Sequence, residues 1–160
     1  MKAVKSILGF FLFTLICLVS HAIGSDSVYH VADFGAKADG KTLNTIAIQN
    51  AIDKAFENGG GIVEFSKGKY LSGSIELKSN VGIYLEKGAT LLGSTNPLDY
   101  HGLNRWKALI LADGQNNVSI SGEGTIDGQG LQLALNADSL YHAGILKDPN
   151  YSVRRKRVSE

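Results

Sequence analysis

A stretch of aromatic and polar residues has the composition of a saccharide-binding wall. It covers residues 94–107 and contains Tyr100, His101, Arg105 and Trp106. Aromatic rings stack on the apolar faces of pyranose sugars, and the guanidinium fork of an arginine pairs with a carboxylate. Loops of this length inside a compact fold are often functional. The alternative is a packing loop whose Trp106 folds back onto the protein, and the sequence leaves both readings open.

The other polar residues form no catalytic or metal-binding pattern. Asp127 lies in the glycine-rich string Gly122–Gly130 (GEGTIDGQG), where we expect its carboxylate to bind the backbone of a turn. His142 has no partner at a spacing that suits a general base or a metal ligand. We therefore expect no catalytic residue, no metal site and no cofactor in this chain. The substrate-binding residues stay unassigned.

The first 24 residues have the organisation of a secretion signal. Lys2 and Lys5 form a basic start, and residues 7–19 are apolar apart from Gly9 and Thr14. A transmembrane helix needs about 20 apolar residues, so a cleaved signal peptide over residues 1–24 is the better interpretation. We expect a secreted or periplasmic protein that has no membrane attachment after cleavage. Cys17 has no small residue immediately before it, which argues against a lipid anchor there.

Removal of this segment leaves a chain that lacks cysteine and is close to neutral. Stability must then come from burial and backbone pairing, because no disulfide can form. Without Lys2 and Lys5, fourteen Lys and Arg face fifteen Asp and Glu, a net charge of −1. This balance indicates neither nucleic acid nor a membrane surface as the principal partner. The basic run Arg154–Arg157 is either a solvated charge run or a contribution to a groove for an acidic polymer.

Residues 59–130 form a ladder of short strand-like runs separated by glycines. Apolar residues occupy every second position within the runs, which is the pattern of strands with one buried face. The connections are too short for helical crossovers, so we predict an all-β solenoid whose coils stack on one another. The runs are Ile62–Phe65, Ser74–Leu85, Ala89–Gly93, Leu109–Ala112 and Val118–Ser121.

A strand and a helix are predicted ahead of this ladder. Val28–Phe34 has a strand pattern, and Thr42–Glu57 has the spacing of an amphipathic helix that Thr42 or Asn44 can cap. Gly59–Gly61 supplies a left-handed stop. We expect the helix to cover the open end of the solenoid core and to protect its exposed strand edge. The apolar stripe of the helix is Ile48, Ala51, Ile52, Ala55 and Phe56.

A weak internal repeat supports the solenoid. Asn80 and Asn117 each begin an Asn-Val-x-Ile segment, and we expect both at equivalent corners in the left-handed conformation. Residues 25–160 provide only about four to six coils. The last 30 residues show neither a clean strand pattern nor an amphipathic capping helix. We therefore expect a truncated solenoid.

Three segments resemble the N-terminal part of glycoside hydrolase family 28, the polygalacturonase-like enzymes that degrade pectin. They are Val31–Ala55, Gly59–Ser94 and Asn116–Gly130, in the order of that family. The first is shared with pectate-lyase-like proteins, whereas GEGTIDGQG is typical of the glycosidases. The resemblance implies a right-handed, single-stranded parallel β-helix with one N-terminal capping helix. It also implies a polygalacturonate or rhamnogalacturonan substrate and a full-length enzyme that is monomeric.

The catalytic motifs that the resemblance implies are missing. Members of the family invert the anomeric centre with carboxylates from an Asn-x-Asp motif and an Asp-Asp pair, followed by Gly-His-Gly and Arg-x-Lys motifs. Asn136-Ala137-Asp138 and Arg154-Arg155-Lys156 have two of these forms, but they precede the expected catalytic coils, and we reject both. The chain contains no Asp-Asp pair and no Gly-His-Gly. We expect the catalytic coils to lie beyond Glu160 and the 160-residue chain to be inactive alone.

Two other functions fit the same predicted fold. A lyase or epimerase would abstract a proton beside a carboxylate, often with calcium, and would need acidic metal ligands in later coils. A non-catalytic β-helical protein would bind the polysaccharide without releasing new reducing ends.

Overall fold

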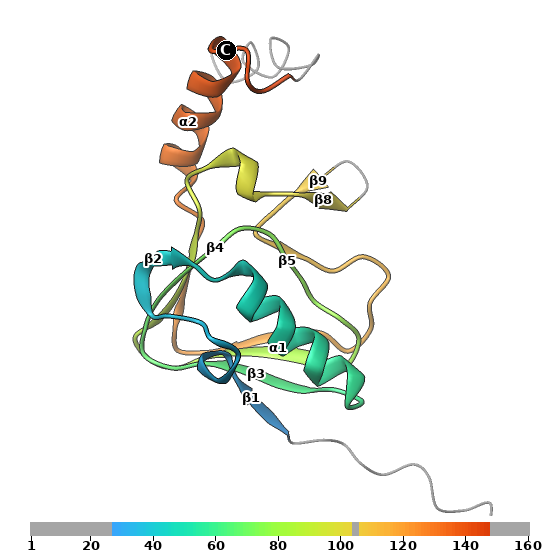
Figure 1. Ribbon diagram of the computed structural model, residues 1–160. Helices are drawn as coiled ribbons and strands as arrows, with labels where there is room; N and C mark the ends of the chain where they lie inside the picture. Colours follow the sequence, from blue (N-terminus) through green and yellow to red (C-terminus); the bar gives the residue numbers. More distant parts are fainter. Residues whose placement is uncertain (1–26, 104–105, 148–160) are drawn as a thin grey trace, which may run out of the picture.

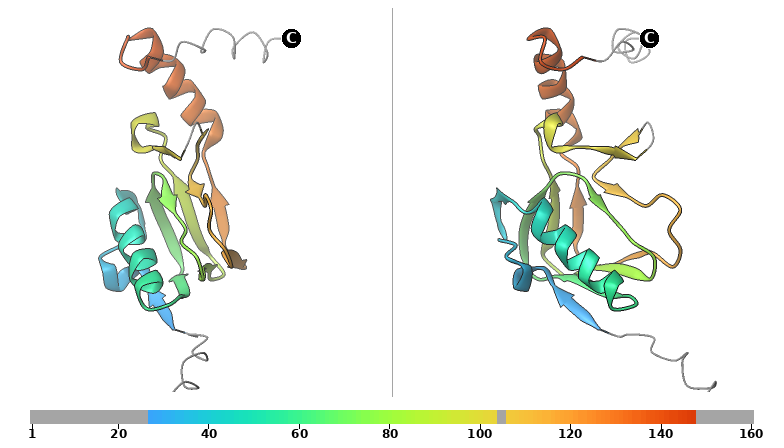
Figure 2. Two further views of the ribbon diagram at one scale, coloured as in Figure 1. Left: turned by 90° about the vertical axis from the view of Figure 1, so that its right-hand side faces the viewer. Right: turned by 45° about the vertical axis from the view of Figure 1, so that its right-hand side comes forward.

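The computed structural model describes residues 27–103 and 106–147, and most of its strands form three parallel sheets (Figure 1). Sheet A has the order β1-β3-β6-β11, sheet B has the order β12-β7-β4-β2, and sheet C pairs β10 with β5. In the two complete coils, which begin at β3 and β6, the chain passes from sheet A to sheet B to sheet C (Figure 2). The strands are β1 (Val28–His30), β2 (Asp39–Leu43), β3 (Gly61–Phe65), β4 (Gly68–Ser72), β5 (Ile75–Glu76), β6 (Val81–Leu85), β7 (Ala89–Gly93), β10 (Ile110–Leu111), β11 (Ser119–Gly122) and β12 (Thr125–Asp127).

The remaining elements lie at the corners and ends of this coil. An antiparallel pair, β8 and β9, interrupts the chain between sheets B and C, and two α-helices flank the strand region. These elements are η1 (Val31–Phe34), α1 (Thr45–Glu57), η2 (Pro97–Asp99), β8 (Gly102–Leu103), β9 (Trp106–Lys107) and α2 (Gly130–His142). Within the described residues, no helix is long and apolar enough to cross a membrane. Residues 1–24 lie outside the described part of the chain.

The interior is built from side chains that stack in register from coil to coil. In sheet A, Val63 pairs with Ile83, and Ile83 pairs with Ile120. In sheet B, Tyr70 pairs with Leu91. Val63, Ile83 and Leu91 are fully buried, and each buried aliphatic side chain contributes about 1.5–3 kcal/mol. The predicted parallel β-helix is confirmed.

Sequence periodicity predicts the inward residues better than the strand ends. The run Ser74–Leu85 is two strands, because the chain turns at Asn80 between β5 and β6. The pattern does not predict β2 or β4, since Asp39-Gly40 resembles a turn and β4 turns only Tyr70 and Ser72 inward. The predicted strand Val28–Phe34 ends at His30, and the chain continues as η1.

Helix α1 occupies the place in the first coil that a strand of sheet C would take. Its predicted stripe is buried at Ile48, Ala51, Ile52 and Ala55, whereas Phe56 is 45% exposed and does not belong to the core. Asn44 stands at the N-cap, but its side chain bonds backbone atoms of Lys37 and Thr42 instead of capping the helix. Gly59 has the expected left-handed conformation, with φ of +92°.

One side chain of α1 makes the hydrogen bonds that a neighbouring strand of sheet C would otherwise make. Gln49 Oε1 accepts a hydrogen bond from the Glu76 amide at 2.8 Å, and Gln49 Nε2 donates to the Glu76 carbonyl at 3.1 Å. This amide reproduces the donor and acceptor of a neighbouring peptide group. It thereby pairs the edge of β5 that faces away from β10. The expectation that the helix protects a strand edge is confirmed.

The two predicted corner asparagines both adopt the left-handed conformation. Asn80 has φ of 65° and Asn117 has φ of 55°. Asn117 Nδ2 donates to Asn80 Oδ1 at 2.9 Å, so the two side chains stack as a ladder between coils. Close contact between coils also explains a glycine of the string GEGTIDGQG. A side chain at Gly122 would collide with the Leu85 carbonyl of the coil before it.

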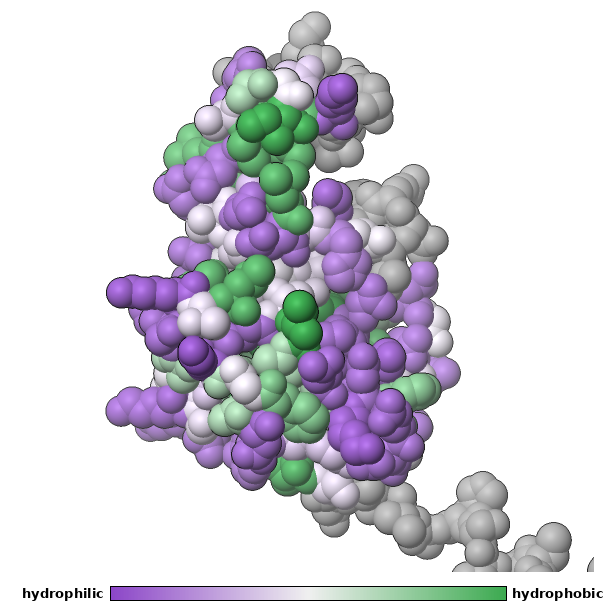
Figure 3. All heavy atoms as spheres, viewed as in Figure 1, coloured by the Kyte–Doolittle hydropathy of each residue, from purple (hydrophilic) through white to green (hydrophobic). Residues whose placement is uncertain are grey.

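The opposite end of the described β-helix is uncovered. Every residue of β11 and β12 is exposed, including Ile120 at 47% and Ile126 at 43%. Helix α2 follows at once and projects from the body, with no buried residue (Figure 1). Figure 3 shows apolar surface over it, where Leu131 and Leu135 are exposed. The apolar pattern does not predict α2. The sequence predicts no amphipathic capping helix in the last 30 residues, whereas Gly130–His142 form a helix in which no residue is fully buried.

Replacement of Gln49 by alanine tests the strand-mimicking role of this side chain. Gln49→Ala leaves the amide and the carbonyl of Glu76 without partners, so we expect a loss of about 1–3 kcal/mol in the free energy of unfolding, measured by urea denaturation. Asn50 lies next to it on the same helix and is exposed. Asn50→Ala should change stability by less than about 0.5 kcal/mol. Equal losses in both variants would contradict the role of Gln49.

A pair of substitutions at Asn80 tests the backbone requirement of the corner. Asn80→Ala removes the ladder contact and places a Cβ-bearing residue at positive φ, for an expected loss of about 1–2 kcal/mol. Asn80→Gly removes the same contact without the backbone strain. Thermal melts should therefore rank the glycine variant above the alanine variant. The reverse order would show that the corner does not require a left-handed residue.

Candidate functional site

The outer surface of sheet C gathers polar side chains from three parts of the chain. Ile75 and Leu77 are buried in the core, so Glu76 between them faces outward. Lys78 follows on the same side. We name this surface the sheet C face. It adjoins α1, the loop of residues 94–108 and the connection of residues 112–117.

The first half of the loop of residues 94–108 is folded on itself by hydrogen bonds. Asn96 accepts from the Leu98 amide at 3.1 Å, and Ser94 donates to the Asp99 carboxylate. The Tyr100 hydroxyl donates to the Ser94 carbonyl at 2.7 Å, and Tyr100 is only 8% exposed. Burial raises the pKa of Tyr100, and the charge of Asp99 raises it further. Tyr100 therefore follows the packing alternative and not the saccharide wall.

His101 is the residue of the predicted wall that reaches the sheet C face. Its Nε2 lies 2.7 Å from Glu76 Oε1. Its backbone amide donates to Ser74 Oγ at 3.1 Å, and this hydroxyl lies 2.6 Å from the Ala108 carbonyl oxygen. Ser74 is buried, so it fixes both ends of the hairpin region to the core. Arg105 and the Trp106 side chain lie outside the described part of the structure.

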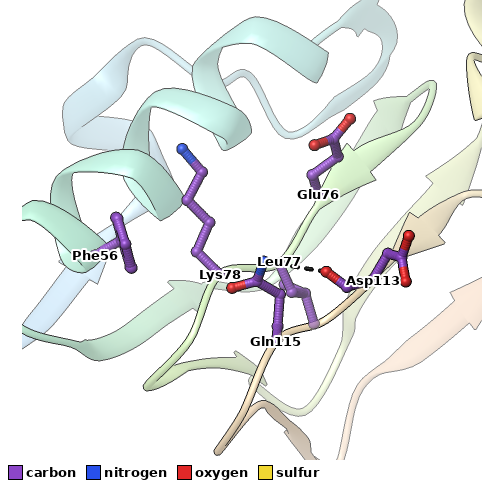
Figure 4. A pocket seen from close by; sticks show the side chains of 6 residues that line it. All are labelled: Phe56, Glu76, Leu77, Lys78, Asp113 and Gln115. Carbon is purple, nitrogen blue, oxygen red and sulfur yellow. Dashed lines mark hydrogen bonds between the residues drawn. The ribbon is translucent and has the colours of Figure 1, made fainter. Parts of the chain in front are cut away.

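A pocket of about 310 Å³ opens where the sheet C face meets α1 (Figure 4). Phe56 and Lys78 line the side next to the helix, and Asp113 and Gln115 come from the connection between β10 and β11. Leu77 and Glu76 complete the lining. We name it the Phe56 pocket. The sequence does not predict this pocket, because Phe56 fits the apolar stripe of the helix.

Two hydrogen-bonded groups make the walls of the Phe56 pocket rigid. Gln115 Oε1 accepts from the Ser79 amide at 2.8 Å and from the Ser79 hydroxyl at 2.9 Å. On the other wall, Lys78 Nζ lies 2.8 Å from Asp53 Oδ1 and 5.5 Å from the centre of the Phe56 ring. The Lys78 ammonium group therefore lies over the Phe56 ring, and its charge is paired with the carboxylate of Asp53.

The pKa of Asp53 reflects this pairing. Partial burial raises it, but hydrogen bonds from Lys78 and Gln49 and the charge of Lys78 outweigh burial, so the pKa lies below its ordinary value of 3.8. Asp53 therefore stays ionised at neutral pH. Lys78 is not available as an unpaired cation for an acidic ligand.

A carboxyl pair lies elsewhere, on the outer surface of sheet A. Burial raises the pKa of Glu64, a hydrogen bond with Glu86 raises it further, and the charge of His30 opposes both. His30 Nδ1 lies 3.2 Å from Glu64 Oε2. Glycosidases hold their two carboxyl groups about 5–9.5 Å apart, to leave room for the sugar or a water. The interaction with Glu86 accounts for part of the raised pKa of Glu64, and we assign no catalytic role to this pair.

The remaining candidate residues also have structural surroundings. Asp127 Oδ1 accepts from the Gln129 amide at 2.9 Å, so the predicted turn role is confirmed. Asn136 Nδ2 donates to the Thr95 carbonyl at 2.8 Å and ties α2 to the loop.

The possibilities for metal binding are limited in the same way. His142 Nε2 lies 3.6 Å from Asp138 Oδ1, and the two residues are one turn apart on α2. In residues 27–103 and 106–147, no group of three or more His, Cys, Asp or Glu side chains is placed to hold a metal ion. The basic run Arg154–Arg157 lies outside the described residues.

Comparison with known proteins identifies relatives of this β-helix. Residues 28–131 match the model of one family, described as rhamnogalacturonase A/epimerase, pectate lyase-like. An exo-poly-α-D-galacturonosidase of Dickeya chrysanthemi is 36% identical over 127 residues, which cover 69% of this chain and 21% of the relative. The chain thus spans about a fifth of the length of that protein.

Two solved structures show the same coil. A candidate glycosyl hydrolase from Parabacteroides merdae superposes with a TM-score of 0.72 and 43% identity, over 76% of this chain and 53% of that one. A family 28 exopolygalacturonase from Yersinia enterocolitica gives a TM-score of 0.57 and 41% identity, over 64% of this chain and 21% of that one. The right-handed parallel β-helix and the polygalacturonase-like resemblance expected from the sequence are both confirmed.

The pH dependence of stability tests the surroundings of Glu64. Its pKa in the folded protein lies above the ordinary value of 4.5, so the folded state binds a proton more tightly than the unfolded state. The ionised carboxylate therefore lowers stability at neutral pH, and this penalty disappears as the pH falls below about 4.5. We expect Glu64→Gln to raise the urea midpoint at pH 7 and to leave it nearly unchanged at pH 4.

A second carboxylate supplies the control. Glu123 has a side chain that is 75% exposed, and Glu123→Gln should move the midpoint little at either pH. A stabilisation by Glu64→Gln that is as large at pH 4 as at pH 7 would rule out a raised pKa as its cause.

Proposed function

The chain belongs to the rhamnogalacturonase A/epimerase, pectate lyase-like family, and on this basis we propose that it forms the N-terminal coils of a glycoside hydrolase that acts on pectic polysaccharide. The observation that carries the proposal is the match over residues 28–131, which includes the capping helix, all three sheets and the GEGTIDGQG string. The reaction proposed is inverting, polygalacturonase-like hydrolysis of galacturonosyl linkages.

The geometry of the described coils supports a polymeric substrate. Stacked coils produce a face that continues from one coil to the next, and the sheet C face is bordered by the fixed loop of residues 94–108. A polysaccharide can lie along such a face and contact several coils at once. His101 and Glu76, which lie 2.7 Å apart, are placed to exchange hydrogen bonds with sugar hydroxyls there.

We propose that the groups that carry out the reaction lie outside the described residues. Inversion requires one carboxylic acid to protonate the leaving oxygen and a second carboxylate, about 6.5–9.5 Å away, to activate water. Within the described part of the chain, we assign no catalytic role to the carboxyl pair Glu64 and Glu86. We propose that the catalytic carboxylates belong to coils that follow β12, and that the present coils position the polymer.

We also propose that residues 1–24 direct the protein out of the cytoplasm and are removed. A polysaccharide too large to cross a membrane must be cleaved outside it, which agrees with the basic start and apolar stretch of this segment. Mass spectrometry of the protein exported by its host would locate the mature N-terminus after residue 24 if this is correct.

A reducing-end assay on polygalacturonate tests the hydrolytic proposal. The protein with its full set of coils should release saturated oligosaccharides whose new anomeric centre is inverted, as followed by proton NMR. The 160-residue chain alone should release none. Hydrolysis by the 160-residue chain would show that its own residues are catalytic, and would overturn the assignment of the acids to later coils.

A lyase or epimerase is the second candidate, because the matched family includes an epimerase in its description. Both act by abstraction of a proton beside the uronate carboxylate. The same incubation separates the candidates: a lyase releases unsaturated sugars that absorb in the ultraviolet, and an epimerase changes ring configuration without new reducing ends. Either result would replace hydrolysis as the function.

A further inference from the structure

A single buried hydroxyl group fixes both ends of the β8–β9 hairpin to the core. Ser74 lies directly before β5 and is only 1% exposed. Its Oγ accepts a hydrogen bond from the amide of His101 at 3.1 Å and donates to the carbonyl oxygen of Ala108 at 2.6 Å. The carbonyl oxygen of His101 is a second possible acceptor at 3.0 Å. One interior atom therefore determines where the backbone of His101 lies relative to sheet C.

The backbone of Glu76 is fixed from the opposite side. Gln49 of α1 binds its amide at 2.8 Å and its carbonyl at 3.1 Å, and the neighbours Ile75 and Leu77 are buried in the core. The carboxylate of Glu76 and the imidazole of His101 thus start from backbone positions that are set independently. Side chains carried by a fixed backbone need less ordering when a ligand binds.

Contact between these two side chains determines which nitrogen of His101 carries the proton. His101 Nε2 lies 2.7 Å from Glu76 Oε1, and a carboxylate oxygen can only accept a hydrogen bond. Nε2 of the neutral imidazole must therefore be the donor, which leaves Nδ1 as an acceptor. The His101 side chain is 53% exposed. None of the side chains that the structure describes donates a hydrogen bond to Nδ1.

From this arrangement we propose that Ser74 is a positioning residue for saccharide binding on the sheet C face. Its hydroxyl holds the backbone of His101 where Glu76 can bind the Nε2–H group, so that Nδ1 accepts a hydrogen bond from a sugar hydroxyl. This role rests on the proposed function, because the ligand is a sugar unit of the pectic polymer. The group recognised is a hydroxyl and not a uronate carboxylate, because two acceptors form no hydrogen bond.

Trigalacturonate and its methyl ester form a matched pair of probes, because they carry the same ring hydroxyls and differ in the carboxylates. We would label the imidazole nitrogens of the 160-residue chain with nitrogen-15 and record their NMR shifts at about pH 8, where histidine is mostly neutral. In the free chain, His101 Nε2 should have the shift of a protonated ring nitrogen and Nδ1 that of an unprotonated one. Both probes should move the Nδ1 signal. A protonated Nδ1 in the free chain, a response to the free acid alone, or no response to either probe would overturn the proposal.

Replacement of Ser74 by alanine tests its positioning role. Ser74→Ala leaves the amide of His101 and the carbonyl of Ala108 without their partner, so we expect the affinity for trigalacturonate to fall about two- to tenfold. The two ring nitrogens of His101 should also lose their distinct protonation states, because the contact with Glu76 is no longer enforced. A loss of folding stability alone would not change these signals. Full affinity in Ser74→Ala would contradict the positioning role.

A second buried serine supplies the matched control. Ser72 is fully buried like Ser74, but its hydroxyl contacts Thr45 and the Gly73 carbonyl instead of the loop of residues 94–108. Ser72→Ala should leave the affinity and the imidazole signals of His101 unchanged, whatever its effect on stability. Equal changes in both serine variants would contradict the role of Ser74.

Glu76→Gln decides the question if Ser74→Ala does not fold. The backbone bonds of residue 76 to Gln49 remain, but a side-chain amide can donate as well as accept, so His101 is no longer restricted to one protonated nitrogen. Affinity and imidazole signals should then both change. Unchanged values of both would contradict the proposal.

These experiments fail independently of the proposed function, because they measure binding and not cleavage. A response of the Nδ1 signal without cleavage of polygalacturonate by the protein with its full set of coils would reject the hydrolase and keep the role of Ser74. Cleavage of polygalacturonate without such a response would keep the hydrolase and reject the role of Ser74.

Discussion

Register between successive coils is the constraint on which this structure depends. Successive strands of sheets A and B pair in parallel, so Val63, Ile83 and Ile120 fall on one line from coil to coil. A shift of one residue would turn every inward side chain to the outside. The corners must therefore have a fixed length and shape. Asn80 and Asn117 provide it by adopting positive φ and by bonding to each other across coils.

The same constraint explains how much of the fold could be predicted from the sequence. Alternation of apolar residues is a local property, so it predicts β3, β6 and β7 and the buried face of each. The asparagine corners are also local, because their conformational preference belongs to the residue itself. Strand β4 and the role of Gln49 depend on contacts between distant residues. No local pattern distinguishes Gln49 from the other polar residues of an amphipathic helix.

The candidate site depends even more than the fold on contacts between distant residues, which local sequence patterns do not predict. Phe56 fits the apolar stripe of α1, yet the helix ends one residue later and the ring faces the pocket. Tyr100 belongs to the stretch whose composition predicts a saccharide-binding wall. Its side chain is buried instead, and its hydroxyl donates a hydrogen bond to the carbonyl of Ser94, six residues away. The facing walls of the pocket come from residues at least 35 positions apart in the sequence. The side chains of the site are therefore assigned by the coiling of the chain and not by sequence spacing.

Helix α1 blocks the addition of a strand at one edge of sheet C. The Gln49 amide occupies both backbone groups of Glu76 on one edge of sheet C, so no further strand can join there. At the other edge, among the described residues, β10 pairs only with β5 and keeps its second side for another strand. Growth of sheet C by strand addition is thus polar: a strand can join beside β10 but not on the side of β5 that Gln49 occupies.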